Sequence, residues 1–205
     1  AITPKTKAIM ICSPNNPTGS QLSKDDLEAL AKIVIKHDLV VLSDEIYAEL
    51  VYDEAYTSFA SIEGMMDRTI LISGFSKGFA MTGWRLGFVC ANEEITAAML
   101  KIHQYAIMCA PTSAQHAALE ALRYGFDYVE EMRRSYLHRR NYLVESFNEL
   151  GLTCHKPGGA FYAFPSIEST GMTSAEFAEK LLLEEKVAVV PGDVFGIGGE
   201  GHIRC

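Results

Sequence analysis

The sequence lacks two features that would assign it to common classes of protein. No stretch approaches the ~20 consecutive apolar residues that a membrane-spanning helix requires. Basic residues are in the minority, with 18 Lys and Arg against 26 Asp and Glu, so the formal net charge is −8. An acidic surface repels phosphate backbones. We therefore expect neither a membrane nor a nucleic acid among the partners of this chain.

Cysteine and histidine are too few, and too irregularly spaced, to indicate a disulfide framework or a metal site. The sequence contains no C-x-x-C pair, and its six histidines show no H-x-x-x-H or other ligand spacing. The odd number of cysteines fits reduced thiols; the five are Cys12, Cys90, Cys109, Cys154 and Cys205. We expect a cytoplasmic protein without metal ligands.

The size of the chain allows one good core or two small ones. Of its 205 residues, 48% are hydrophobic and 21% are charged, as in soluble globular proteins. The sequence begins without a methionine and stops at Arg204-Cys205, just after a Gly-rich turn. A domain seldom ends on the first residues of a strand, so we expect a fragment of a longer protein.

Apolar runs that alternate with helical patterns predict a layered α/β fold. Buried strands are expected over residues 8–12, 39–42, 69–72 and 86–90. The pair Ser23 and Asp26 has the spacing of a capping box and predicts a helix after the first strand.

The last third of the chain is expected to form a second unit. An apolar stripe predicts a helix over residues 127–150, long enough to bridge two domains. Strands are then expected near residues 152–155, 160–164 and 187–190, with a helix from Thr173 that Glu176 helps to cap. We predict one domain over residues 1–140 and a smaller one over residues 141–205.

Three of the predicted strands run into clusters of polar residues. The first is followed by NNPTG at residues 15–19, the second by Asp44 with Tyr47, and the third by Ser76-Lys77 with Arg85 eight residues after the lysine. Parallel strands that end at one edge of a sheet would bring these clusters together. A lysine amine forms a Schiff base with an aldehyde, and an arginine holds a phosphate through two parallel hydrogen bonds. The clusters suit an anionic aromatic aldehyde.

Five motifs, in this order, resemble the class I and II aminotransferases of fold type I, the superfamily of aspartate aminotransferase. They are SPNNPTG, SDEIYAEL, SGFSKGFAMTGWRLG, PGGAFYAFP and PGDVFGIGGEGHIR. The resemblance runs the whole length of the chain and implies the C-terminal half of such an enzyme. The implied fold is α/β, with part of the mainly parallel-sheet large domain followed by a smaller α+β domain.

The resemblance also implies a cofactor, a reaction and partners. The cofactor is pyridoxal 5′-phosphate, and the reaction transfers an amino group between an amino acid and a 2-oxo acid. The complete enzyme is expected to be a homodimer. In the family that this chain resembles, the N-terminal half, which is absent here, supplies three further parts of the active site. They are a Gly-rich loop that binds the phosphate, an aromatic side chain that stacks on the cofactor ring, and a tyrosine from the other subunit of the dimer. We therefore expect this chain to be inactive alone.

The same resemblance assigns roles around the cofactor ring. Lys77 would form the Schiff base with the cofactor and move a proton between the substrate Cα and the cofactor C4′. Asp44 would pair with the pyridinium nitrogen. Tyr47 and Asn16 would hydrogen-bond the ring O3′, and Asn16 also belongs to the substrate side.

Phosphate and substrate contacts follow from the same resemblance. Arg85, with Ser76, would bind the phosphate, although many relatives carry Ser or Thr where this chain has Gly74. Arg204 would grip the substrate α-carboxylate, and Phe161 would line the substrate side of the pocket.

Alternatives remain at the level of function and of single residues. A related fold-type I lyase or synthase would share most of these motifs, and a catalytically silent fragment is the alternative outside enzymes. Of the adjacent carboxylates at residues 44 and 45, only one is expected to be buried, and the spacing to Tyr47 favours Asp44. Residues 196–201 match G-x-G-x-x-G, the fingerprint of a dinucleotide-binding site, which requires a helix after the glycines. A strand is expected there instead, so we predict no dinucleotide site. The glycines are expected to form a turn that orients Arg204.

Overall fold

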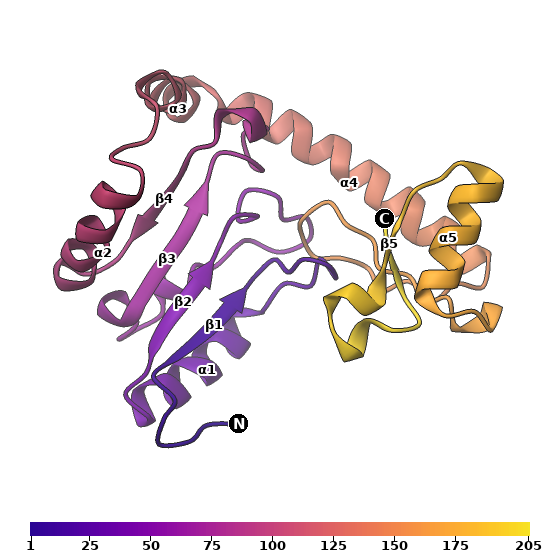
Figure 1. The fold of residues 1–205 in the computed structure, drawn as a ribbon, viewed down its shortest axis with the longest axis horizontal. Helices are drawn as coiled ribbons and strands as arrows, with labels where there is room; N and C mark the ends of the chain where they lie inside the picture. The colour runs from indigo at the N-terminus through magenta and orange to yellow at the C-terminus, as the bar shows by residue number, and fades with distance from the viewer. The chain divides into compact units, whose positions relative to one another are not determined.

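The computed structural model describes all residues, 1–205, and its contacts divide the chain into two units (Figure 1). The first unit holds Ala1–Pro14 and Leu22–Arg133, and the second holds Asn15–Gln21 and Arg134–Cys205. The division falls inside helix α4, Phe126–Glu149. The boundary predicted between residues 140 and 141 lies in the same helix and stays a prediction.

The first unit is built on a four-stranded sheet. Its order is β1 (Ala8–Cys12), β2 (Val40–Asp44), β3 (Thr69–Gly74) and β4 (Gly87–Cys90). The first three strands are parallel, and β4 runs antiparallel to β3. The four strands expected from the sequence are confirmed within two residues at each end, and the sheet is mainly parallel as predicted.

Helix α1 (Lys24–Lys36) begins at the capping box that the sequence predicts. The Ser23 hydroxyl accepts the Asp26 N–H at 3.1 Å, and the Asp26 carboxylate accepts the Ser23 N–H at 3.0 Å. These two bonds satisfy N–H groups that a helix start leaves without partners.

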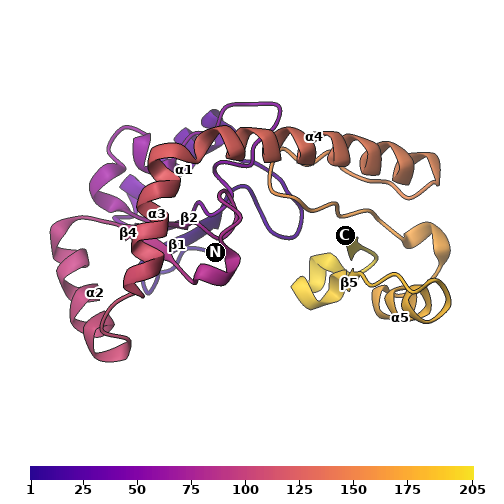
Figure 2. The same cartoon turned by 90° about the horizontal axis from the view of Figure 1, so that it is seen from above.

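The core of the first unit lies between α1 and one face of the sheet (Figure 2). Every fully buried Val, Leu or Phe contributes ~1.5–3 kcal/mol from the transfer of apolar surface out of water. The cluster contains Leu27, Ala31, Val34, Leu39, Val41, Phe59, Ile62 and Met65. Phe59 belongs to a short 3₁₀ helix, η1 (Phe59–Ser61), and η2 (Met66–Arg68) leads into β3.

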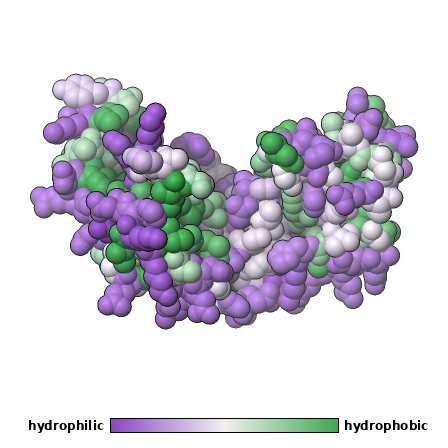
Figure 3. Space-filling model, turned by 90° about the horizontal axis from the view of Figure 1, so that it is seen from below, coloured by the Kyte–Doolittle hydropathy of each residue, from purple (hydrophilic) through white to green (hydrophobic).

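Apolar side chains are open to the surface elsewhere in this unit. After η3 (Thr82–Trp84) and β4 come α2 (Glu93–Ala106) and α3 (Thr112–Tyr124), and α2 buries none of its residues. Figure 3 shows apolar side chains, in green, at the surface of the part of the molecule that holds the sheet. The exposed ones on this stretch are Trp84, Phe88, Val89, Leu100, Ile102, Tyr105, Ile107, Met108, Leu119, Leu122 and Tyr124.

The second unit combines the end of α4 with α5 (Ser174–Glu185) and a two-stranded antiparallel sheet, β5 (Val190–Pro191) with β6 (Ile203–Arg204). The predicted capping box at Thr173 and Glu176 is confirmed. Short 3₁₀ helices complete the unit: η4 (Glu168–Thr170), η5 (Gly192–Phe195) and η6 (Ile197–Gly199). The strand expected after the glycines of residues 196–201 is present as β6.

Two strands predicted for the second unit are wrong. Residues 152–155 and 160–164 form no strand, and the strand expected from residue 187 begins only at Val190. Ala160 has φ +58°, which breaks an extended backbone, and Pro157 and Pro165 have no N–H to donate. Pairing is limited to single residues: Ala163 and Cys205 exchange both backbone hydrogen bonds, at 3.0 and 2.9 Å.

Across the chain, no helix combines the length and the apolar character needed to cross a membrane.

Candidate active site

The first unit brings three of the predicted site residues together at the carboxyl ends of β2 and β3. Asp44 is the last residue of β2, and Tyr47 lies in the turn that follows and is 3% exposed. Lys77 lies in the turn after β3, and its Nζ is 6.0 Å from the centre of the Tyr47 ring. Since β2 and β3 are parallel neighbours, their ends meet at one edge, as the sequence argument requires.

The two adjacent carboxylates differ in burial, but in the opposite sense to our expectation. Glu45 is the buried one, 4% exposed, whereas Asp44 is half-buried. Glu45 Oε1 accepts the Ser43 and Ser58 hydroxyls, both at 2.9 Å, whereas Asp44 Oδ1 accepts the Ile46 N–H at 3.1 Å. Side chains alternate along an extended chain, so these two carboxylates face opposite sides of the strand end. Glu45 is therefore bonded inside the fold, and Asp44 is the more exposed of the two carboxylates at the end of β2.

Tyr56 adds a titratable group to this region. Burial raises the pKa of its hydroxyl well above the ordinary value of 10.0, and the negative charge of Glu45, with which it forms a hydrogen bond, raises that pKa further. The Tyr56 side chain is therefore a neutral donor to Glu45 at all ordinary pH values.

Replacing Tyr56 by phenylalanine is expected to reduce the loss of free energy of unfolding that occurs when the pH rises above 10. Because the pKa is higher in the folded chain, the protonated hydroxyl contributes stability below pH 10, and this contribution is lost as the pH rises further. One group contributes a slope of at most ~1.4 kcal/mol per pH unit. In urea unfolding above pH 10, the free energy of unfolding of the wild type should fall more steeply than that of Tyr56→Phe.

The control is Tyr142→Phe, because Tyr142 is 70% exposed. It should keep the wild-type slope. If the free energy of unfolding of Tyr56→Phe fell with pH as steeply as that of the wild type, the proposed contribution of the Tyr56 hydroxyl would be wrong.

The predicted phosphate ligands lie on the segment after β3. Ser76 is in the turn with Lys77, and Arg85 is exposed, has φ +53° and donates from Nη1 to the Thr82 carbonyl at 2.8 Å. A Cβ at Gly74 would lie 2.9 Å from Gly87 Cα, so the close approach of β3 and β4 demands glycine there.

The second unit brings the other two polar site residues together. Arg204 Nη1 donates to Asn16 Oδ1 at 2.7 Å, although the residues are 188 positions apart. The Arg204 guanidinium also lies over two rings, at 4.7 Å from Tyr162 and 4.8 Å from Phe195. Such cation–π contacts are attractive and restrict the side chain. Neither ring could be predicted from the sequence, because only the fold shows that both flank Arg204.

Phe161, predicted to line the substrate side, packs against aromatic neighbours of the same unit. Its ring centre is 5.3 Å from Tyr136 of α4 and 4.9 Å from Tyr162. Phe161 thus supports the segment that carries one of the two rings at Arg204.

Backbone contacts fix the turn that carries Asn16. The Gly19 N–H donates to Asn15 O at 2.8 Å, and Gly19 O accepts the Gly159 N–H at 3.0 Å. Arg140 of α4, which is buried, donates from Nη1 to Pro157 O at 2.8 Å. The segment around Pro157 is thereby held by α4 on one side and by Gly19 on the other.

Replacing Gly19 by alanine is expected to lower the free energy of unfolding by about 2–4 kcal/mol, from a left-handed backbone and overpacking together. Gly19 has φ +68°, and a Cβ there would lie 2.5 Å from Pro157 Cβ and 2.8 Å from Gly159 O. The measurement is chemical denaturation. Gly198→Ala in the same unit is the matched control, because a Cβ at Gly198 meets nothing within 4 Å. An equal, small effect of both variants would contradict this account of the turn.

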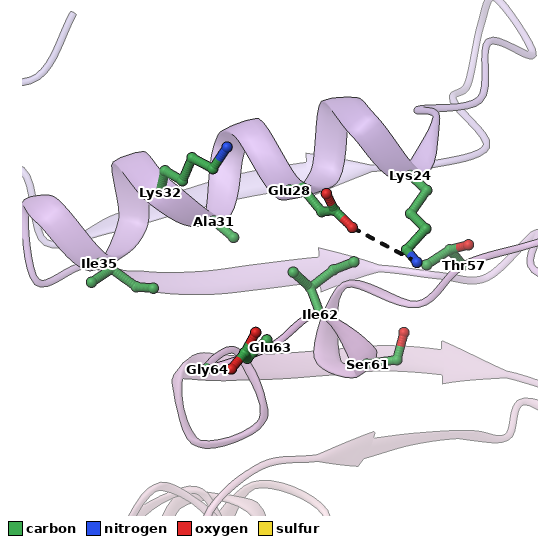
Figure 4. A pocket seen from close by; sticks show the side chains of 10 residues that line it. All are labelled: Lys24, Glu28, Ala31, Lys32, Ile35, Thr57, Ser61, Ile62, Glu63 and Gly64. Atoms are coloured by element: carbon green, nitrogen blue, oxygen red, sulfur yellow. Dashed lines mark ion pairs between the residues drawn. The ribbon is translucent and has the colours of Figure 1, made fainter.

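A groove of about 890 Å³ lies apart from these residues, between α1 and the segment that contains η1 (Figure 4). Figure 4 shows the ion pair of Lys24 and Glu28, 3.7 Å apart, along this groove. Both side chains are largely exposed, at 67% and 48%, so their pairing adds little stability. None of the predicted site residues lines this groove, and it has no buried polar side chain that would hold a ligand.

Comparison with known proteins assigns the chain to a family. The aminotransferases of class I and II match residues 1–205, and the chain belongs to this family. It is 65% identical to a putative aminotransferase, YugH, of Bacillus subtilis over 205 residues, which are 100% of this chain and 53% of that protein. It is 52% identical over 206 residues to an aspartate aminotransferase of Pyrococcus abyssi, covering 99% of this chain and 53% of the other.

The fold is shared with solved aminotransferases. An aromatic aminotransferase from Pyrococcus horikoshii matches with a TM-score of 0.96 and 51% identity, over 99% of this chain and 55% of that one. The predicted fold-type I class is therefore confirmed. The chain spans about half the length of the curated relatives it matches.

Proposed function

We propose that this chain is part of a pyridoxal-phosphate-dependent enzyme that transfers an amino group between an amino acid and a 2-oxo acid. The observation that carries the proposal is the grouping of Lys77, Asp44 and Tyr47 at neighbouring strand ends, in a chain of the aminotransferase family. The roles of the individual residues are part of the proposal.

The residues present fit the cofactor by the chemistry of their side chains. An amine, a carboxylate and a phenol lie at one edge of the sheet, and the turn after β3 leads to Arg85. The half-buried Asp44 carboxylate accepts one hydrogen bond from the backbone at Oδ1, unlike the heavily bonded Glu45. Aldehyde, pyridine nitrogen, ring oxygen and phosphate would each find a complementary group in this set.

When bound, the cofactor supplies an electron sink for the pair of electrons left at the substrate Cα. Lys77 would hold the cofactor covalently and, once the amino group of the substrate has displaced its amine, would move the proton between the substrate Cα and the cofactor C4′. Asp44 would keep the pyridine nitrogen protonated through a charge-assisted hydrogen bond. The Tyr47 hydroxyl would donate to the ring O3′, and Arg85 with Ser76 would bind the phosphate.

Substrate recognition rests on the second unit. Arg204 offers a guanidinium to the α-carboxylate of the amino acid, and Asn16 orients that guanidinium through its Oδ1. Phe161 lines the substrate side. The relatives bear the names of aspartate and of aromatic-amino-acid aminotransferases, so the proposal stops at a 2-amino acid as donor. We further propose a cytoplasmic homodimer, and the apolar side chains exposed around β4 and α2 are consistent with burial in an assembly.

The test uses the protein expressed from its complete coding sequence. Incubated with pyridoxal 5′-phosphate, a panel of amino acids and 2-oxoglutarate, it should show a visible absorbance band and form glutamate. A related lyase would instead release ammonia from the amino acid without requiring a 2-oxo acid. A silent protein would show neither product, and either result would reject the proposed reaction.

The 205-residue chain assayed beside it should bind the cofactor weakly, if at all, and have no meaningful transaminase activity. Its family relatives are about twice as long, and efficient proton transfer needs the ring held near its productive orientation. Comparable specific activity of the two proteins would show that our division of the active site is wrong.

A further inference from the structure

Glu45 has no role in the proposed reaction, yet it is among the most heavily bonded side chains of the first unit. Its Oε1 accepts three donors: the Ser43 hydroxyl at 2.9 Å, the Ser58 hydroxyl at 2.9 Å and the Phe59 N–H at 3.2 Å. The Tyr56 hydroxyl is hydrogen-bonded to the same carboxylate. With 4% of its surface exposed, Glu45 is held by protein groups on all sides.

The donors come from separate segments of the chain. Ser43 belongs to β2, whereas Tyr56, Ser58 and Phe59 lie on the loop that leads into η1 and at its start. The Glu45 carboxylate thus links the end of β2, through hydrogen bonds, to a loop that lies eleven or more residues further along the chain. Bonds from neutral donors to a charged acceptor are shorter and stronger than neutral ones.

The backbone of Glu45 is fixed as well. Its N–H donates to Ile72 O of β3 at 2.8 Å, and its carbonyl accepts the Ala48 N–H at 3.0 Å and the Ser73 hydroxyl at 3.3 Å. The residue directly before it is Asp44, and the turn that it begins carries Tyr47. Any shift of Glu45 must therefore move both of these side chains.

We propose that Glu45 is a positioning residue whose carboxylate, anchored to the loop of residues 56–59, fixes the directions of Asp44 and Tyr47 toward the cofactor ring. This inference rests on the function proposed above. Consecutive side chains point to opposite sides of an extended segment. The hydrogen bonds that hold the Glu45 side chain on one side therefore also fix the direction of the Asp44 side chain on the other. A misplacement of about 1 Å in such a site can cost 10²-fold in rate.

The test compares three variants of the complete protein, loaded with pyridoxal 5′-phosphate. Glu45→Gln removes the charge and keeps one acceptor oxygen, and Ser58→Ala removes one donor. Ser61→Ala is the matched control, because Ser61 lies in η1, the 3₁₀ helix that Ser58 precedes as its N-cap, but its hydroxyl donates to the Ser58 carbonyl at 2.7 Å and not to Glu45. The readouts are kcat, the KM for the amino donor, and the visible circular dichroism of the bound cofactor, which reports the orientation of the ring.

We expect Ser58→Ala to lower kcat about threefold to tenfold and Glu45→Gln to lower it at least about tenfold, as for small misplacements of catalytic groups. The KM should change less than about twofold, because Arg204 and the substrate side are untouched. The visible circular dichroism should change in both variants and stay unchanged in Ser61→Ala.

A purely structural role predicts a different pattern. If Ser58→Ala and Glu45→Gln melt at a lower temperature but keep the wild-type kcat and circular dichroism when folded, the inference is overturned. If Glu45→Gln does not fold, Ser58→Ala alone decides. A wild type without a visible band and without transamination would instead reject the proposed function, so the two failures are distinguishable.

Discussion

Replacing Lys77 by alanine is expected to abolish the visible absorbance of the bound cofactor and to lower the rate of transamination by several orders of magnitude. In the proposed function this amine both holds the cofactor and carries the proton at the substrate Cα, so its removal takes away two steps at once. The absorbance spectrum and the rate are measured on the complete protein.

A second lysine variant makes the result specific. Lys32 is exposed on α1 and lines the groove of Figure 4, away from the ends of β2 and β3. Lys32→Ala should keep the wild-type spectrum and rate. An unchanged spectrum and rate in Lys77→Ala would show that another residue carries the cofactor.

Replacing Asp44 by alanine is expected to leave the cofactor bound but to lower kcat about 10- to 100-fold. A charge-assisted hydrogen bond is worth roughly 1.5–3 kcal/mol, and each ~1.4 kcal/mol corresponds to tenfold in rate. Without the carboxylate, the pyridine nitrogen would be largely unprotonated and would withdraw electrons poorly. The measurements are kcat and the cofactor content after dialysis.

Glu63→Ala serves as the control for loss of a carboxylate, because Glu63 is exposed and lies beside the groove of Figure 4. It should leave kcat unchanged. Near-wild-type turnover of Asp44→Ala would contradict the proposed role of Asp44 at the ring nitrogen, whatever the effect of Glu45 variants, which are also expected to lose turnover.

Local signals were sufficient for most of the fold. The capping boxes at Ser23 and Thr173 depend on residues three positions apart, and the buried strands are short apolar runs, so neither requires knowledge of distant contacts. The predicted strand over residues 160–164 failed because Ala160 adopts φ +58°, a conformation that the sequence does not reveal.

The sequence was less informative about which carboxylate is buried and what surrounds Arg204. The spacing to Tyr47 selected Asp44 for the site, but three of the four donors to the Glu45 carboxylate come from residues 56–59, whose approach to β2 is a tertiary contact. Likewise, Asn16 and Arg204 lie at opposite ends of the chain, and nothing in their spacing predicts their hydrogen bond. Motifs indicated residue identities, whereas partners required the fold.

The two rings and the amide around Arg204 also govern how the binding free energy would depend on the ligand. A long side chain that is mobile before binding loses roughly 0.5–1.5 kcal/mol of rotamer entropy when a ligand immobilises it. Arg204 is already confined by Tyr162, Phe195 and Asn16. Binding a carboxylate there would cost little further entropy, and the cost would be equal for every 2-amino acid. In the proposed function, preference among donors would then arise from contacts with the substrate side chain, where the donors differ.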